Sequence, residues 1–168
     1  MVYLIGYMGA GKTTISKLLA KELHLPFYDT DQEIEKKEKR SVSEIFKKDG
    51  EFHFRMLETE LLKNINENSI VSCGGGLPIH NNNIGLINSK GISIYLKASN
   101  NYLFNRLKNE KKNRPLITNK TDKELEVYIK NELQNRSPFY NLANHIISID
   151  NKKTDKVLRE INSLFSTF

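Results

Sequence analysis

Cysteine is nearly absent from the sequence: Cys73 is the only one among 168 residues. A single cysteine excludes an intrachain disulfide and any zinc site that needs several cysteines. Proteins that hold no disulfide are typical of reducing compartments, and we therefore expect a cytoplasmic protein.

Long apolar runs are also missing. No stretch approaches the roughly 20 apolar residues that a membrane-spanning helix requires. The first apolar run, Val2 to Ile5, begins at the second residue, so we expect no signal peptide. The sequence shows no internal repeat and no linker, and 38% of its residues are hydrophobic and 27% charged. These proportions are typical of a soluble globular protein, so we expect one domain over residues 1–168 and no membrane partner.

The net charge is strongly positive, +6 at pH 7. A basic protein can bind nucleic acid, bind small anionic ligands, or carry a solvated lysine-rich surface. The lysines are spread over polar stretches such as 35–40 and 108–112, and no basic segment is interleaved with aromatic residues. We therefore expect no nucleic-acid partner.

The most informative stretch follows the first apolar run. Gly6 to Thr13 reads Gly-Tyr-Met-Gly-Ala-Gly-Lys-Thr, which fits G-x-x-x-x-G-K-[ST] at each fixed position. Apolar residues recur behind it at helical spacing, at positions 15, 18, 19 and 23. A strand, this loop and a helix in that order predict a phosphate-binding loop.

Each residue type in this loop suits a polyphosphate. Glycines let successive backbone N–H groups surround a phosphate, and the following helix directs its positive end toward the same anion. The Lys12 ammonium can reach the β- and γ-phosphates, and the Thr13 hydroxyl can ligate Mg²⁺. The alternative is a glycine-rich turn that only caps a helix, and the strand–loop–helix context argues against it. The expected ATP-binding residues here are Gly9, Ala10, Gly11, Lys12, Thr13 and Thr14, with Lys12 also catalytic.

Strand-like and helix-like segments alternate along the rest of the chain, which predicts right-handed crossovers and a parallel sheet. We expect an α/β protein with the three-layer P-loop NTPase fold, in which helices flank a central five-stranded parallel sheet. Residues that follow the strands should converge at one edge, where ligands bind in such sheets. The expected strands are 2–5, 26–29, 70–73, 92–96 and 145–149. Helices are expected at 32–39, 81–89, 100–107 and 122–135. Three further helices are expected: a short one capped by residues 41–44, one that begins at Glu51, and one that contains residues 157–165.

Two interruptions are expected in this pattern. Residues between Lys108 and Thr121 are polar and have no helical or strand period, which is typical of a loop that covers a site. We expect a mobile lid over about residues 109–123. The run from Arg136 to Tyr140 contains Pro138 and is expected to break the preceding helix.

Six motifs in one order carry a resemblance to a known family. They are Gly6 to Thr13, Asp29-x-Asp31, Phe54-Arg55-x-x-Glu58, Gly74-Gly75-Gly76, Arg114-Pro115-Leu116 and Arg136-x-Pro138-x-Tyr140. Over essentially the whole chain the sequence resembles the shikimate kinases, within the nucleoside-monophosphate-kinase group of phosphate-loop folds. The resemblance implies ATP-dependent phosphorylation of the shikimate 3-hydroxyl, with ATP and shikimate as partners, Mg²⁺ as cofactor and a monomeric enzyme.

Shikimate is a small carboxylate with three hydroxyls, so its site needs cations and hydrogen-bond acceptors. The resemblance makes Arg55 and Arg136 the carboxylate clamp, because a guanidinium fork matches a carboxylate with two parallel hydrogen bonds. Glu51 and Glu58 each lie one turn from Arg55, and either could hold it in position. The alternative for Arg55 is a surface arginine in a local ion pair. The substrate-binding helices are expected at about residues 31–62.

The resemblance assigns the two aspartates different roles. Asp31 is expected to accept the hydrogen bond of the reacting hydroxyl and to act as its base, and Asp29 to hold Mg²⁺ beside Thr13. On a regular strand, residues two apart project to the same face, so both carboxylates could point into the site. The alternative for Asp31 is the N-cap of the helix that follows.

The triple glycine and the presumed lid complete the expected site. Gly74, Gly75 and Gly76 should let the backbone approach the substrate ring and donate an N–H to a hydroxyl. Ser72 stands where other phosphate-loop enzymes carry an aspartate, which leaves the metal to Asp29. Arg114 is expected to swing over the transferring phosphoryl group. For the arginine that stacks on adenine, Arg106 is expected, with Lys108 as the alternative.

Other functions remain possible at this level. A gluconate or nucleoside monophosphate kinase would use similar cations, and the Asp29-x-Asp31 pair with the triple glycine favours shikimate. A nucleotide-dependent switch or a nucleic-acid-binding module is a third possibility. A switch would need loops that the γ-phosphate orders and a surface for a partner.

Overall fold

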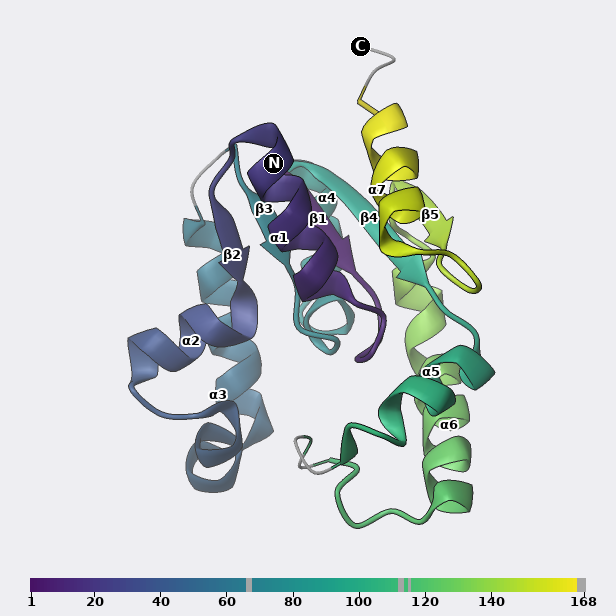
Figure 1. Ribbon diagram of the computed structural model, residues 1–168. Helices are drawn as coiled ribbons and strands as arrows, with labels where there is room; N and C mark the ends of the chain where they lie inside the picture. The colour runs from purple at the N-terminus through teal and green to yellow at the C-terminus, as the bar shows by residue number, and fades with distance from the viewer. Residues whose placement is uncertain (66–67, 112–113, 115, 166–168) are drawn as a thin grey trace.

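The structure, a computed structural model, describes residues 1–65, 68–111, 114 and 116–165. Within these residues five strands form one parallel sheet in the order β2-β3-β1-β4-β5 (Figure 1). The expected α/β fold with a five-stranded parallel sheet is confirmed. The strands are β1 Val2–Ile5, β2 Phe27–Asp29, β3 Ile70–Ser72, β4 Ile92–Lys97 and β5 His145–Ser148.

Helices cover both faces of this sheet. Figure 1 shows α1 in front of the sheet and α4 behind it. The helix α1 contacts α7 as well as β1 and β3, whereas α4 contacts α3 and β4. The helices are α1 Lys12–Leu23, α2 Thr30–Glu38, α3 Val42–Asn64, α4 Asn83–Lys90, α5 Asn100–Leu107, α6 Asp122–Tyr140 and α7 Thr154–Ser163, with a short 3₁₀ helix η1 at Leu77–Ile79.

The strand order places β3 between β1 and β2, and this insertion assembles the site. Ser72 is in register with Leu4 on one side and with Asp29 on the other. The carboxyl ends of the three strands therefore lie at one level, and the segments that leave them begin side by side. The phosphate loop follows β1, helix α2 follows β2 and the triple glycine follows β3.

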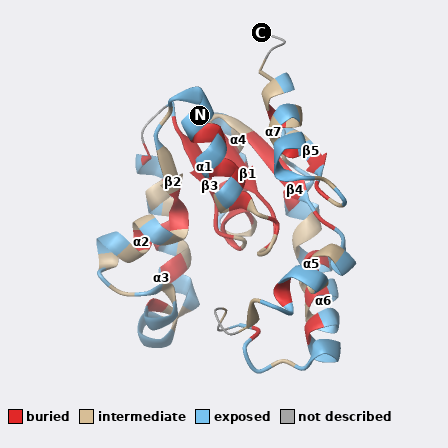
Figure 2. Cartoon of the chain, viewed as in Figure 1, coloured by how far each residue is buried: buried red, intermediate tan, exposed pale blue. Residues whose placement is uncertain are grey.

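The core lies along the sheet, where every residue of β1 and β3 is buried (Figure 2). A second, smaller apolar cluster joins α2 to α3 and consists of Ile34, Ile45, Phe54 and Leu57. This cluster holds the two helices together, and Leu61 packs against both it and the main core. Within the described residues, no helix is long and apolar enough to cross a membrane.

The structure decides where α3 is divided and where α2 begins. The predicted division of α3 is confirmed, because Gly50 has non-helical angles (φ 83°, ψ 170°) in the middle of this helix. Helix α2 begins at Thr30 rather than Gln32, so the suggestion that Asp31 is the N-cap is wrong. The N-cap is Asp29, whose carboxylate accepts the Gln32 N–H. Asp31 lies in the first helical turn, and the idea that both aspartates project from one strand is therefore also wrong.

The predicted break between Arg136 and Tyr140 is wrong as well, because α6 runs without interruption from Asp122 to Tyr140 with Pro138 inside it. Proline lacks an N–H and disfavours a helix interior. Here it stands in the last turn, and packing compensates for it, since Leu133 and Tyr140 on the two sides of it are buried.

The expected lid falls partly outside the described residues, which exclude 112, 113 and Pro115. Its described part is mostly turns, and its last two residues, 122 and 123, already belong to α6. The side chain of Ile117 is buried in the core, whereas that of Leu116 is 65% exposed. Lys111 Nζ donates to Lys120 O at 2.9 Å and to the Asp122 carboxylate, which joins the two ends of the segment.

Candidate active site

The phosphate loop presents an ammonium at the carboxyl end of β1. The Lys12 side chain is buried and donates to Tyr7 O at 3.0 Å, so the loop backbone fixes its position. Burial lowers the pKa of Lys12 to about 8, and the nearby Asp31 carboxylate opposes this shift. Gly9 and Gly11 have φ values of 82° and 84°, in the region that glycine adopts without strain. The loop therefore takes a backbone path that other residues would resist.

Three oxygen-bearing side chains gather beside Lys12. Thr13 Oγ1 donates to Asp29 Oδ2 at 2.8 Å and lies 3.3 Å from Ser72 Oγ. The three residues come from the start of α1 and the ends of β2 and β3, which the strand order places side by side. Hydroxyl and carboxylate oxygens are the ligands that Mg²⁺ prefers, and this ion usually keeps several waters, so the cluster fits a hydrated Mg²⁺. In the described part of the chain no group of three or more His, Cys, Asp or Glu residues could hold a metal.

Asp31 lies in the first turn of α2 and faces the triple glycine. Desolvation and, to a lesser extent, the charge of Asp29 raise the pKa of its carboxyl to about 6 against the opposing effect of Lys12. A carboxyl with this pKa is ionised at neutral pH and still takes up a proton readily, which suits a group that receives one from a hydroxyl.

Each glycine of the triple run lies against one of the expected substrate residues. A Cβ at Gly74 would overlap Asp31 Oδ1, and one at Gly76 would stand 2.5 Å from Arg55 Nη1. A Cβ at Gly75 would stand 3.4 Å from Arg136 Nη1. Any larger residue at positions 74 or 76 would therefore displace a charged side chain.

Side chains from other elements fix the path of the triple glycine. The Gly74 N–H donates to Thr30 Oγ1 at 2.8 Å, and the Tyr140 hydroxyl donates to Gly75 O at 2.6 Å. The Gly74 N–H is thus already used within the protein. The prediction that the glycines donate an N–H to the substrate stays open only for Gly75 and Gly76.

Arg55 is held by both of the glutamates that were considered. Arg55 Nη1 donates to Glu58 Oε2 at 2.8 Å, and Glu51 Oε1 accepts from Arg55 Nε at 3.1 Å and Nη2 at 2.8 Å. The guanidinium also lies 5.6 Å from the ring centroids of Phe46 and Phe54. Glu58 is 1% exposed, and desolvation raises its pKa to about 7 although Arg55 opposes the shift.

Arg136 approaches the glycines from α6. Its guanidinium is paired with Glu132 and stands over the Tyr7 ring, 5.3 Å from the ring centroid. Tyr7 belongs to the phosphate loop, and its hydroxyl is buried without a hydrogen-bond partner in the described residues. The Tyr7 ring therefore links the phosphate loop, which holds Lys12, to the arginine expected to hold the substrate carboxylate.

Two further arginines enter the cleft from the side of α5. Arg114 donates to Glu110 Oε2 from Nε at 3.0 Å and from Nη2 at 2.6 Å. Arg106 Nε lies 3.7 Å from Glu110 Oε1, and its guanidinium lies 3.5 Å from the position of a Cβ on Gly11. Lys108, the alternative adenine contact, stands instead over the Phe104 ring.

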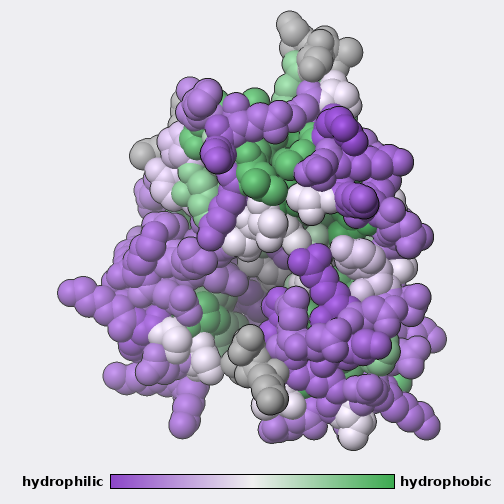
Figure 3. Space-filling view, in the orientation of Figure 1, coloured by the Kyte–Doolittle hydropathy of each residue, from purple (hydrophilic) through white to green (hydrophobic). Residues whose placement is uncertain are grey.

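These groups border one cleft of about 330 Å³. Figure 3 shows a recess, largely hydrophilic at its rim, between the α2–α3 side and the α5–α6 side of the molecule. Most of the expected nucleotide and metal residues line the cleft, whereas Ala10, Gly76, Arg55 and Arg136 do not. The two arginines instead lie against Gly75 and Gly76. The lining residues are Met8, Gly9, Gly11, Lys12, Thr13, Thr14, Asp29, Asp31, Ser72, Cys73, Gly74, Gly75, Arg106, Glu110 and Arg114.

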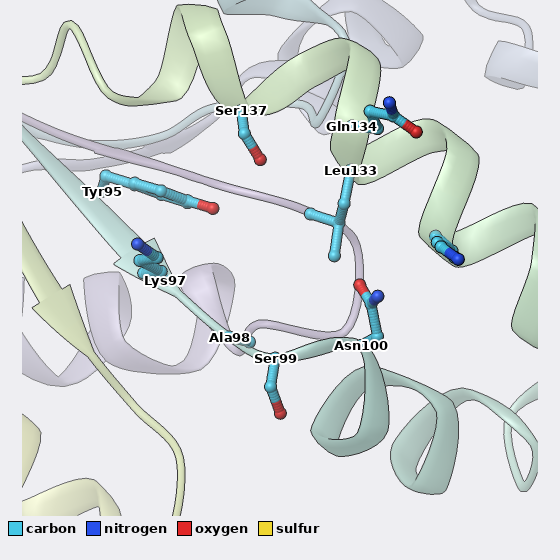
Figure 4. A pocket seen from close by; sticks show the side chains of 9 residues that line it. Tyr95, Lys97, Ala98, Ser99, Asn100, Leu133, Gln134 and Ser137 are labelled. Atoms are coloured by element: carbon cyan, nitrogen blue, oxygen red, sulfur yellow. The ribbon is translucent and has the colours of Figure 1, made fainter.

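A larger and more open depression of about 540 Å³ lies between the end of β4 and helix α6 (Figure 4). It is lined by Tyr95, Leu133 and mostly exposed polar side chains, and it contains none of the residues singled out from the sequence. We assign the active site to the smaller cleft because the buried lysine, the carboxylates and the oxygen cluster are there.

Sequence reasoning missed four residues at this site. Thr30 and Tyr140 fix the glycine run, Tyr7 lies under Arg136, and Glu110 joins two arginines. Tyr140 stood in one of the six motifs without a role of its own. Glu110 left a signal in its spacing, because it stands four residues after Arg106 and four before Arg114, as in helical ion pairs.

Comparisons with known proteins agree on one family. The sequence model of the family described as shikimate kinase matches residues 8–165. Shikimate kinase of Flavobacterium johnsoniae is 42% identical over 164 residues, which cover 95% of each chain. That of Azobacteroides pseudotrichonymphae is 40% identical over 163 residues, covering 95% of this chain and 96% of the relative.

Solved structures give the same result. The crystal structure of shikimate kinase from Bacteroides thetaiotaomicron matches with a TM-score of 0.92 and 36% identity, covering 98% of this chain and 97% of that one. Shikimate kinase from Acinetobacter baumannii, in complex with shikimate, matches with a TM-score of 0.88 and 31% identity, covering 99% of this chain and 92% of that one.

Proposed function

We infer the function of this cleft from one premise: the chain belongs to the shikimate kinase family. It is an ATP-dependent kinase that phosphorylates shikimate, in the biosynthesis of chorismate and the aromatic amino acids. The roles of individual residues below, and the choice of the 3-hydroxyl as acceptor, are our proposals. They rest on one observation: the phosphate loop, the oxygen cluster and Asp31 line a single cleft, and two arginines stand against the glycines at its border.

ATP occupies the cleft with its phosphates on the phosphate loop. Gly9 to Thr14 surround the β-phosphate, with Ala10 contributing only its backbone, and Lys12 pairs with the β- and γ-phosphate oxygens. Arg106 stands over the first turn of α1 and is the better candidate for the adenine contact, since Lys108 does not line the cleft. Lys12 is held by Tyr7 O before the nucleotide arrives, so little reorganisation is needed on binding.

Mg²⁺ is the proposed cofactor, with Thr13 and Asp29 as its protein ligands and Ser72 beside them. When bound, this ion neutralises charge on the β- and γ-phosphate oxygens. The carboxylate of Asp29 also caps α2, so the residue that holds the ion fixes the start of the helix that carries Asp31.

Shikimate binds between α3, α6 and the triple glycine. Arg55 and Arg136 hold its carboxylate, and Gly74, Gly75 and Gly76 allow the ring to approach the backbone. Glu51 and Glu58 keep the Arg55 guanidinium in one orientation, and Glu132 and the Tyr7 ring do the same for Arg136. The two arginines of the clamp come from distant parts of the chain. Together they fix the orientation of the ring, so that one hydroxyl faces Asp31.

Asp31 then orients the 3-hydroxyl and takes its proton as the phosphoryl group is transferred. Lys12 and Arg114 stabilise the charge on the transferring group, to which a cationic finger can contribute a factor of ~10³ in rate. We propose that the segment 109–123 acts as a mobile lid, and that its closure brings Arg114 over the γ-phosphate and excludes water. We propose that the protein is a cytoplasmic monomer.

The assignment can be tested by coupled ADP release with a panel of acceptors. ADP release is expected with shikimate and ATP, and neither gluconate nor a nucleoside monophosphate should replace shikimate. Chelation of divalent ions should abolish release, and added Mg²⁺ should restore it. Release with gluconate and none with shikimate would refute the proposal, and full activity in the chelator would refute the metal site.

A further inference from the structure

One carboxylate stands between the two arginines of the nucleotide cleft. Glu110 Oε2 accepts both the Nε and the Nη2 hydrogen bond of Arg114, and Glu110 Oε1 lies 3.7 Å from Arg106 Nε. All three side chains line the cleft that contains Lys12. Arg114 and Lys12 therefore border the same space, so the paired guanidinium already stands at the cleft that the phosphate loop borders.

Unlike Asp29 and Asp31, Glu110 has no metal or acceptor hydroxyl to serve in this cleft, and its charge opposes the binding of a polyphosphate because like charges repel. A carboxylate and a phosphate also compete for the same face of a guanidinium, since both accept two parallel hydrogen bonds from its fork. The Arg114 donors that pair with Glu110 are thus the donors that a phosphate would use.

We propose that Glu110 is a positioning residue that occupies Arg114 in the nucleotide-free enzyme and yields it to the γ-phosphate when ATP binds. This inference rests on the proposed role of Arg114 at the transferring group. Glu110 keeps the arginine beside the loop, and ATP binding must break both hydrogen bonds that Arg114 donates to Glu110 Oε2. Nucleotide affinity is lower as a result, and Arg106 is freed from the same carboxylate in the same step.

The test is calorimetric titration of a non-hydrolysable ATP analogue into the Glu110→Gln enzyme. Glutamine keeps the size of the side chain and removes its charge. The dissociation constant is expected to fall about threefold to tenfold, and the fall should be smaller for ADP, which lacks the γ-phosphate. Glu60→Gln is the matched control, because it breaks an ion pair with Lys37 of 2.8 Å outside the cleft and changes the net charge equally.

The Arg114→Ala background separates pairing from simple repulsion. There Glu110→Gln should change the affinity for the analogue less than twofold. If Glu110→Gln binds the analogue no more tightly than the wild-type enzyme does, the proposal is overturned. It is also overturned if Glu110→Gln tightens binding equally with Arg114 present and in the Arg114→Ala enzyme, because that result indicates charge repulsion alone. If Arg114→Ala by itself leaves turnover intact, the proposed role of Arg114 fails. If Arg114→Ala lowers turnover but Glu110→Gln has no effect on binding, only this inference fails.

Discussion

Gly74 leaves no room for a side chain between itself and Asp31: a Cβ at position 74 would overlap Asp31 Oδ1. Asp31, the proposed proton acceptor, can therefore take this position only because residue 74 is a glycine. Because Gly74 and Asp31 follow β3 and β2, the contact also shows how sheet order produces the site.

Gly74→Ala should therefore move Asp31 and lower turnover with shikimate by at least tenfold. ATP binding should stay within about twofold of the wild-type value, because the phosphate loop is untouched. Steady-state kinetics and calorimetry measure the two effects. Gly50→Ala is the control, since a Cβ there meets nothing within 4 Å, although its φ of 83° costs stability. Unchanged turnover in Gly74→Ala would show that the position of Asp31 is not critical.

The pH profile should report Asp31 directly. Its pKa is raised to about 6 in the ligand-free enzyme, so kcat/KM for shikimate should fall as the pH is lowered through 6, approaching tenfold per pH unit, as the carboxylate becomes protonated. A pH profile of kcat/KM for shikimate checks this because it reports ionisation of the free enzyme, and an acid limb near pH 4 would contradict it.

The raised pKa of Asp31 also affects folding stability, and here the ionised carboxylate is the unfavourable form. A carboxyl whose folded-state pKa is raised contributes stability below its unfolded value of 3.8, and that contribution is lost as the pH rises through 6. Asp31→Asn is therefore expected to abolish most activity and to raise the melting temperature at pH 8, with a smaller gain at pH 4. A lower melting temperature at pH 8 would mean that the charged carboxylate stabilises the fold.

Arg55→Lys tests whether the guanidinium fork matters or only its charge. Lysine cannot satisfy Glu51 and Glu58 together with a substrate carboxylate, so the Michaelis constant for shikimate should rise about tenfold or more, with that for ATP unchanged. Arg40→Lys is the matched control, because Arg40 pairs with Glu38 and Asp49 away from the cleft. Equal effects of the two substitutions would argue against Arg55 as a substrate contact.

The Tyr7 ring provides a test of Arg136. Replacement by leucine removes the aromatic face, an interaction worth about 0.5–2 kcal/mol, so shikimate binding should weaken by about twofold to thirtyfold. Tyr7→Phe keeps the ring and loses only an unpaired hydroxyl, so binding should be nearly unchanged. Calorimetry with shikimate distinguishes the two variants. Equal weakening in both would assign the effect to the hydroxyl rather than to the ring.

The sequence predicted the fold well because its signals are local. The run Val2 to Ile5, the glycine loop and the apolar periodicity each determine one element, and alternation of strands and helices implies a parallel sheet. The errors occurred where burial outweighs local preference, or where two neighbouring residues were equally good candidates for one role. A proline breaks most helices, but α6 continues through Pro138, with the buried residues Leu133 and Tyr140 on either side of it. The carboxylate of Asp29, rather than that of Asp31, caps α2, which spacing alone could not decide.

The positions of the expected substrate residues followed from the resemblance, whereas their supporting contacts did not. Thr30 and Tyr140 fix the glycine backbone through bonds across 44 and 65 residues of sequence. No local pattern encodes such pairs, because they depend on which strands and helices become neighbours. Glu58 was identified beside Arg55, but its burial and raised pKa required the packed structure.

The most direct test is a crystal structure of the enzyme with ADP and shikimate bound. The β-phosphate should lie on the loop from Gly9 to Thr14, the shikimate carboxylate should contact Arg55 and Arg136, and one ring hydroxyl should lie within hydrogen-bond distance of Asp31. Shikimate bound away from these arginines, or a nucleotide seated in the depression beside α6, would contradict the central claim that both substrates meet in this cleft.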